Sequence, residues 1–412
     1  MRFRRFTMLL SVYILAVSLF SFGQQKSMPA TNDLFKPFLK SSGGDVVELS
    51  LEQDSVLVRR TKFSSKNGVN KIYCITASPI SSGRYPAILF FHGGSSHADE
   101  LKRYLRSYAA RGYVAMAIDL PGICNPDKAM LSEGPWRNRA KEPDSRFDIA
   151  QGIQNSSLTD AVTAALEAFN ILAGMSNVDD RHLGLTGFSW GGYMTTMVSG
   201  LLGNRLSAAY SVFGCGFYDR GSKWKDLLAT MPEQQRSDWI KNLDAGRKAS
   251  NIKCPFFIEE SINDEYFWPE AVMATLDAVE AEKGLTWGPN LDHRRPDAGE
   301  HMQALYFDYY LKRKGAPFGK INIKRTTDNS DRSRDVFVNV TLPKNITATR
   351  VLLYYADKNT IRSLKIWKPI SAVKLSDDNY KITIPAAVIK NNINYYVCLT
   401  DSRQVSISTY LQ

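Results

Sequence analysis

Residues 183–194 read Leu-Gly-Leu-Thr-Gly-Phe-Ser-Trp-Gly-Gly-Tyr-Met and contain the pattern Gly187-Phe-Ser189-Trp-Gly191. The residues before this pattern have the apolar character of a strand, and residues 192–202 have that of a helix. A G-x-S-x-G pattern between a strand and a helix is typical of a nucleophile elbow, a sharp turn that exposes a serine in strained backbone geometry. We therefore predict that Ser189 is a nucleophile. A glycine-rich turn in another kind of α/β protein is the alternative.

Outward from this turn, apolar runs alternate with helical patterns as far as residue 314. Such alternation predicts a mostly parallel sheet with helices on both faces. Two runs with alternating polarity precede it and predict antiparallel leading strands at 56–62 and 71–77. The other predicted strands are 85–91, 113–119, 206–213, 254–260 and 285–287, and the predicted helices are 100–111, 157–172, 192–202, 269–283 and 296–314, with further helical patterns over 222–248.

The pattern changes after residues 315–319. Short β-like runs follow at 336–341, 349–356, 363–368, 380–384 and 395–400, without a helical period. We therefore predict an α/β domain over residues 45–318 and a small β-sandwich domain over residues 320–412.

The charge of the chain is unevenly distributed. The whole chain carries +11, of which residues 320–412, with fifteen Lys and Arg against seven Asp, carry +8. A basic domain of this kind can face an anionic surface or polymer. A solvated basic face without a partner is the alternative.

The first 23 residues differ from the rest. Three arginines precede an apolar run over residues 8–22, and small residues end it, as in a secretory signal peptide. The run is shorter than the roughly 20 residues of a membrane span. We expect a periplasmic or secreted protein with no transmembrane span after signal removal and no nucleic-acid partner; an uncleaved anchor is the alternative.

A serine needs a base to accept its proton and an acid to orient that base. Only two histidines follow Ser189. His293 lies in the loop after the last predicted strand, whereas His301 lies inside a helical pattern, so we select His293. Asp264 follows the strand that precedes it in the chain. We prefer Asp264 to its neighbours Glu259, Glu260 and Glu265, because the first two lie on the strand and the third would point away.

The glycine pair after residues 85–91 can turn backbone N–H groups toward a pocket. We therefore predict an oxyanion hole made of Trp190 together with Gly94 or Ser95, and a structural role for His92. The long segment 124–155 predicts a lid or substrate wall. The candidate wall residues are Trp136, Arg137 and Trp268. The sequence contains no metal-binding cluster, phosphate loop or cofactor motif, and its five cysteines have no C-x-x-C spacing.

These motifs resemble those of the α/β-hydrolase superfamily, and within it the prolyl oligopeptidase, dienelactone hydrolase and acetylxylan esterase group. The resemblance rests on His92-Gly-Gly94, residues 187–194, Asp264 and Asn290-Leu-Asp-His293, and it covers residues 45–318. The Ser-Trp-Gly-Gly-Tyr-Met stretch is most similar to the oligopeptidases. Their usual β-propeller does not fit, since fewer than 70 residues separate the signal segment from His92.

The Asn-x-x-His ending is more similar to exported esterases. The resemblance implies hydrolysis of carboxylic esters of small molecules or polysaccharides, with acetylated xylan as the analogy. A peptidase of the same fold is one alternative, and a non-catalytic binding protein on a hydrolase scaffold is another. Because all proposed catalytic residues precede residue 320, we expect the α/β domain to hydrolyse small esters without residues 320–412.

Overall fold

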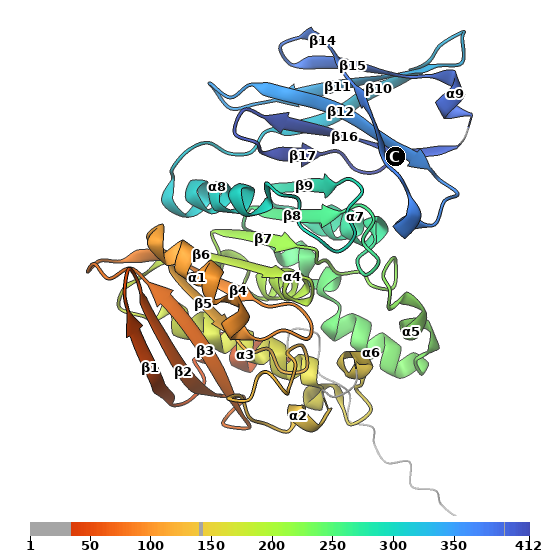
Figure 1. Ribbon diagram of the computed structural model, residues 1–412. Coiled ribbons are helices and arrows are strands. Elements are labelled where there is room, and N and C mark those ends of the chain that lie inside the picture. The colour runs from red at the N-terminus through yellow and green to blue at the C-terminus, as the bar shows by residue number, and fades with distance from the viewer. Residues whose placement is uncertain (1–33, 140–142, 391) are drawn as a thin grey trace, which may run out of the picture.

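The computed structural model describes residues 34–139, 143–390 and 392–412, so the predicted signal segment lies outside the described residues. A nine-stranded sheet forms the centre of the α/β domain, in the order β1-β2-β3-β5-β4-β6-β7-β8-β9 (Figure 1). Its strands are β1 (Val46–Gln53), β2 (Leu57–Ser65), β3 (Asn70–Ser78), β4 (Tyr85–Phe91), β5 (Val114–Ile118), β6 (Val178–Phe188), β7 (Ala208–Val212), β8 (Phe256–Ser261) and β9 (Lys283–Gly288).

Strands β4 to β9 pair in parallel, and β1, β2 and β3 add an antiparallel edge. The apolar run of β4 lies at the centre and is buried from Ala87 onward, as a strand covered on both faces should be. The strand order reverses around β4, which lies between β5 and β6. Ligands of open α/β sheets bind at the carboxyl edge beside such a reversal. The fold thus places a candidate site at the ends of β4 and β6.

Helices cover both faces of the sheet, as predicted (Figure 1). On one face, α1 and α8 lie side by side, and the rings of Tyr108 and Phe307 are 6.2 Å apart. Helices α3 and α4 pack on the other face. Shorter helices cover the carboxyl edge. The helices of this domain are α1 (Lys102–Ala110), α2 (Trp136–Arg139), α3 (Ser157–Ala173), α4 (Trp190–Leu202), α5 (Lys225–Thr230), α6 (Glu233–Leu243), α7 (Pro269–Ala278) and α8 (Gly299–Lys312).

The C-terminal region consists of two antiparallel four-stranded sheets, so the predicted fold class is confirmed. Their orders are β10-β11-β15-β14 and β13-β12-β16-β17. The elements are β10 (Lys320–Asp328), β11 (Arg334–Thr341), β12 (Ala348–Asp357), β13 (Lys368–Ser371), β14 (Val373–Ser376), β15 (Asn379–Ile384), the short helix α9 (Ala386–Ile389), β16 (Ile393–Asp401) and β17 (Ser406–Ser408).

One strand prediction in this region is wrong. Residues 363–368 alternate apolar and polar side chains, but most of them form a loop with a 3-10 turn at Arg362–Leu364. The apolar side chains of Ile361, Leu364 and Ile366 are 69%, 67% and 69% exposed. Alternation predicts a strand only when one side of the segment faces a core. Here the segment projects toward the α/β domain. Strands β1, β10, β13, β14 and β17 were not predicted from the sequence.

The C-terminal domain packs against the β9 edge of the central sheet (Figure 1). Trp287 of β9 donates its backbone N–H to Ser408 Oγ at 3.1 Å and its indole N–H to Thr409 O at 3.1 Å. All five cysteines are free thiols. No helix in the described part of the chain is long and apolar enough to cross a membrane.

Candidate active site

Ser189 lies at the turn between β6 and α4 with φ 58° and ψ −119°. A non-glycine residue in this conformation costs about 1–3 kcal/mol and persists only where its surroundings enforce it. The surroundings include a hydrogen bond from Ser189 N–H to Val212 O at 2.8 Å. A Cβ on Gly187 would lie 2.4 Å from Gly191 O, and one on Gly191 would lie 2.2 Å from Phe91 O. The two glycines are therefore required by the close approach of the turn to β4.

Asp264 and His293 lie together at the same edge of the sheet, beyond β8 and β9. His293 Nδ1 donates to Asp264 Oδ2 at 2.5 Å. The other carboxylate oxygen of Asp264 accepts the backbone N–H groups of Tyr266 and Phe267, at 2.6 and 3.0 Å. The Asp264 side chain is fully buried, and that of His293 is 25% exposed. The carboxylate thus holds one imidazole tautomer and leaves Nε2 free for proton transfer.

The end of β7 connects this pair to the serine. Val212 accepts the Ser189 N–H, and the ring of the next residue, Phe213, lies 5.0 Å from the His293 ring. Tyr266 packs on His293 from another side, with ring centroids 4.9 Å apart. His301 lies in α8, where its Nε2 is 3.0 Å from Arg403 O. The structure therefore brings the selected histidine, not the alternative one, to the edge where Ser189 lies.

The acidic neighbours of Asp264 have other environments. Glu259 accepts two hydrogen bonds from Arg295 and one from Tyr210, each 2.7 Å long. Glu260 is fully buried, and this burial, together with the adjacent Asp264 charge, raises the pKa of its carboxyl well above the ordinary range. Glu265 is exposed.

The proposed oxyanion donors come from the loop after β4 and from the first residue of α4. A Cβ on Gly93 would lie 3.4 Å from Ser189 Cβ, and one on Gly94 would lie 3.1 Å from the Trp190 ring. Ser95 N–H already donates to Ile123 O at 3.0 Å. We therefore correct the sequence prediction: Ser95 is not an available donor, and Gly94 and Trp190 remain.

His92 lies beneath the surface at the start of this loop and contacts its backbone. It is fully buried, and burial lowers the pKa of its imidazole. Its Nε2 accepts the N–H of Leu120 at 3.0 Å, while Nδ1 lies 2.8 Å from Gly93 O. The neutral ring thus satisfies backbone groups on two strand ends, as expected for a structural residue.

Two of the three candidate wall residues have a different role. Trp136 is fully buried and donates to Glu133 O at 3.4 Å. Arg137 donates to the backbone carbonyls of Pro126, Ala129 and Ser132 at 2.7–2.9 Å. These side chains pack and bond within their own loop. Trp268, in contrast, lies four residues after Asp264 and is half-buried.

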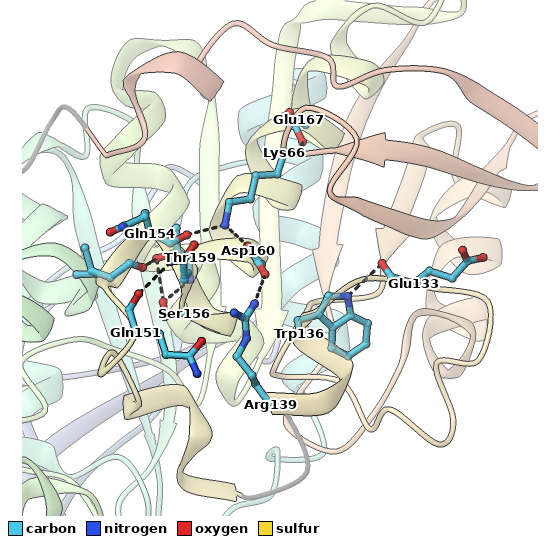
Figure 2. A network of polar contacts seen from close by, with 12 residues as sticks. Lys66, Glu133, Trp136, Arg139, Gln151, Gln154, Ser156, Thr159, Asp160 and Glu167 are labelled. Atoms are coloured by element: carbon cyan, nitrogen blue, oxygen red, sulfur yellow. Dashed lines mark hydrogen bonds and ion pairs between the residues drawn. The ribbon is translucent and has the colours of Figure 1, made fainter.

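Figure 2 shows how this loop is attached to the domain. Asp160, buried in the first turn of α3, accepts hydrogen bonds from Lys66 at 2.5 Å and from Arg139 at 3.2 Å. Lys66 also donates to Gln154 O at 2.6 Å. Ser156 caps α3 by accepting Thr159 N–H at 3.1 Å. The buried Asp160 carboxylate therefore anchors Arg139, and Lys66 anchors the backbone at Gln154, so two points of segment 124–155 are attached to the body of the domain.

The part of this segment that approaches the site was not predicted. The Arg146 guanidinium lies 4.6 Å above the Trp190 ring, and its two terminal nitrogens are each 3.8 Å from where a Cβ on Gly94 would be. Burial lowers the pKa of this guanidinium. The next residue, Phe147, stacks on Trp239 at 4.8 Å. No periodic signal marks these two residues, because they lie in a 3-10 turn between irregular segments.

A cavity of about 510 Å³ lies elsewhere, between β8, β9 and α8 on one side and β10 and β17 on the other. None of the proposed catalytic residues lines it. Within the described ranges, no group of histidine, cysteine, aspartate or glutamate side chains has the geometry to hold a metal ion.

A strained serine turn after a central strand of a mostly parallel sheet defines the α/β-hydrolase class. The chain belongs to the dienelactone hydrolase family, which matches residues 72–285. Acetyl xylan esterase 1 from Thermoanaerobacterium sp. JW/SL YS485 has a similar structure, with a TM-score of 0.56 and 18% identity over 69% of this chain and 94% of that one. The acetyl xylan esterase from Paenibacillus sp. R4 matches with a TM-score of 0.56 and 20% identity over 68% and 93%.

Proposed function

We propose that this protein is an exported serine esterase that uses Ser189, His293 and Asp264 as a catalytic triad. The observation that carries the proposal is the hydrogen bond of 2.5 Å between His293 and Asp264, at the sheet edge where a serine with φ 58° also lies. A buried carboxylate and a strained backbone both cost free energy of folding. Proteins retain such features at reactive sites. The N-terminal charge and hydropathy pattern supports export.

In this mechanism His293 Nε2 accepts the proton of Ser189 Oγ while the oxygen attacks the ester carbonyl. The backbone N–H groups of Trp190 and Gly94 stabilise the resulting oxyanion. His293 then protonates the leaving alcohol, and an acyl-enzyme forms on Ser189. His293 then deprotonates a water molecule, which attacks the acyl-enzyme, and His293 returns this proton to Ser189 Oγ as the acid leaves. Asp264 keeps Nε2 aimed at the reacting oxygen throughout.

An aromatic cluster surrounds the side chain of Trp190. Phe147 and Trp224 pack against Trp190 with ring centroids at 6.0 and 4.9 Å, next to the proposed oxyanion donors. The two similar structures are both acetyl xylan esterases, which favours a carbohydrate ester as the substrate. The charge of +8 on residues 320–412 favours a polysaccharide that carries acidic groups.

Labelling with a fluorophosphonate probe tests the serine, and release of acetate tests the substrate class. The full chain should be labelled and should hydrolyse nitrophenyl acetate and acetylated xylan. Ser189→Ala should abolish labelling and lower turnover by several orders of magnitude, because triad residues act as a unit. His301→Ala is the matched control for His293→Ala and should leave turnover nearly unchanged.

The same panel includes nitroanilide peptides. Preferential cleavage of these peptides would replace the esterase proposal with a peptidase of the same fold. A wild-type chain that is folded, unlabelled and inert on all three substrates would support the binding-protein alternative.

A further inference from the structure

A loop of the C-terminal domain contacts both loops that carry the proposed acid and base. This loop, residues 358–367, joins β12 to β13, and we call it the bridging loop. Asn263, which precedes Asp264, donates to Arg362 O at 3.1 Å and to Lys365 O at 2.7 Å. Asn290, three residues before His293, donates to Trp367 O at 3.0 Å and accepts Trp367 N–H at 2.7 Å. Two asparagines therefore connect the α/β domain to the backbone of the bridging loop.

The two catalytic loops are also connected to each other at this point. Asn263 N–H donates to Leu291 O at 3.2 Å, and Ser261 Oγ donates to Arg294 O at 2.6 Å. Asn290 has φ 57°, a conformation that asparagine tolerates better than most residues. The acid loop, the base loop and the bridging loop thus form one hydrogen-bonded unit around the pair of Asp264 and His293.

Side chains extend the contact. The Arg362 guanidinium lies 4.2 Å above the Trp268 ring, and its Nη2 is 3.3 Å from Glu270 Oε2. Trp367 is buried and packs on Tyr396 of β16 with ring centroids 5.2 Å apart. The apolar side chains of the bridging loop other than Trp367 are exposed. Within its own domain the loop is held by Trp367, by Lys365 Nζ, which donates to Asn394 Oδ1 at 2.8 Å, and by Lys358 N–H, which donates to Asn392 O at 2.9 Å. Its other contacts are with the α/β domain.

We infer that the bridging loop is a component of the active site, and that Asn263 and Asn290 are positioning residues that hold Asp264 and His293 in register. This inference rests on the proposed function. It changes the expectation that residues 320–412 are dispensable for hydrolysis of small esters. Displacement of a catalytic group by about 1 Å can cost on the order of 100-fold in rate. Loss of the asparagine contacts should therefore lower kcat even for a substrate too small to touch the C-terminal domain.

The full-length variant Asn290→Gly tests this inference. Glycine accepts the positive φ, so the substitution removes both contacts with Trp367 without straining the backbone. Asn345→Gly is the matched control, because Asn345 has φ 65°, is exposed and lies in the C-terminal domain before β12. We expect Asn290→Gly to lower kcat for nitrophenyl acetate and the rate of fluorophosphonate labelling by about 10–100-fold, with KM changed less than threefold. Asn345→Gly should change neither.

Two further readouts separate positioning from a loss of stability. The His293 Nδ1 proton, in a short hydrogen bond to Asp264, should give a far-downfield NMR resonance in the wild type and in Asn345→Gly, and the resonance should broaden or vanish in Asn290→Gly. Asn290→Asp keeps the oxygen that accepts Trp367 N–H and should restore part of kcat. If Asn290→Gly does not fold, Asn263→Ala takes its place with the same measurements.

The outcomes distinguish the two proposals. A folded Asn290→Gly variant with wild-type kcat, labelling rate and downfield resonance overturns the inference and leaves the esterase proposal standing. A folded wild-type chain that the probe does not label overturns both. A lower kcat with unchanged KM, together with partial rescue by Asn290→Asp, supports the positioning role.

Discussion

Arg295→Met should destabilise the protein in a way that depends on pH. Arg295 lies two residues after His293 and makes two hydrogen bonds of 2.7 Å to Glu259 on β8. The Glu259 side chain is fully buried, and that of Arg295 is 12% exposed. Removal of the guanidinium leaves a carboxylate whose remaining partner is the Tyr210 hydroxyl. Breaking a buried ion pair in this way typically costs about 3–5 kcal/mol.

Protonation limits the cost. The buried carboxyl of the variant can take up a proton, and for a glutamate with an ordinary pKa of about 4.3 this uptake costs about 3.7 kcal/mol at pH 7 but only about 1 kcal/mol at pH 5. Between these pH values the folded variant holds a proton that the unfolded chain has lost. Stability of the variant therefore falls as the pH rises. We expect a loss of about 3–4 kcal/mol at pH 7 and about 1 kcal/mol at pH 5.

Urea unfolding, followed by tryptophan fluorescence at both pH values, measures this difference. The double variant Glu259→Gln with Arg295→Met is the control, because its amide accepts the Tyr210 hydroxyl without charge. Its loss of stability should be nearly independent of pH. A single-variant loss below about 1 kcal/mol at pH 7, or an equal loss at both pH values, would refute the reasoning.

Three other changes have defined outcomes. Gly191→Ala should lower the free energy of unfolding, measured with urea, by about 1–3 kcal/mol or more and should abolish ester turnover. The alanine Cβ would lie 2.2 Å from Phe91 O. An active variant of normal stability would contradict the geometry of the turn. Glu260→Gln should stabilise the protein relative to the wild type, increasingly as the pH rises above about 4.3, the pKa of a glutamate in an unfolded chain. The reason is that burial keeps the wild-type carboxyl protonated in the folded state, whereas the unfolded chain loses that proton. A stability difference that is constant from pH 5 to pH 8 would argue against a protonated Glu260. Arg137→Ala should make segment 124–139 more sensitive to proteolysis and should leave KM for small esters unchanged. The reason is that the Arg137 guanidinium donates to carbonyls of its own loop. A large rise in KM would indicate that Arg137 contributes to the substrate wall after all.

Local and chain-order information was enough to predict the architecture and to select three candidate catalytic residues. The elbow around Ser189 depends on short-range rules, because glycines at fixed offsets and a strand followed by a helix leave few other conformations. Asp264 and His293 were selected from their place in the chain, each in the loop that follows a predicted strand. The carboxyl ends of parallel strands lie at one edge of a sheet, so loops that follow such strands lie near one another even when they are far apart in the sequence.

Contacts that no sequence pattern encodes decided where the remaining side chains and loops lie. Segment 124–155 has no periodicity that assigns its side chains to a face, so the environments of Trp136 and Arg137 could not be predicted. In the structure Trp136 is buried, and the Arg137 guanidinium donates to carbonyls of its own loop. The backbone N–H of Ser95 is not available to an oxyanion because it donates to Ile123 O. The alternation over residues 363–368 indicated a strand, yet Asn263 and Asn290 of the other domain bind that backbone. Sequence patterns encode which face a regular element buries, whereas the partners of irregular loops are set only when the domains pack together.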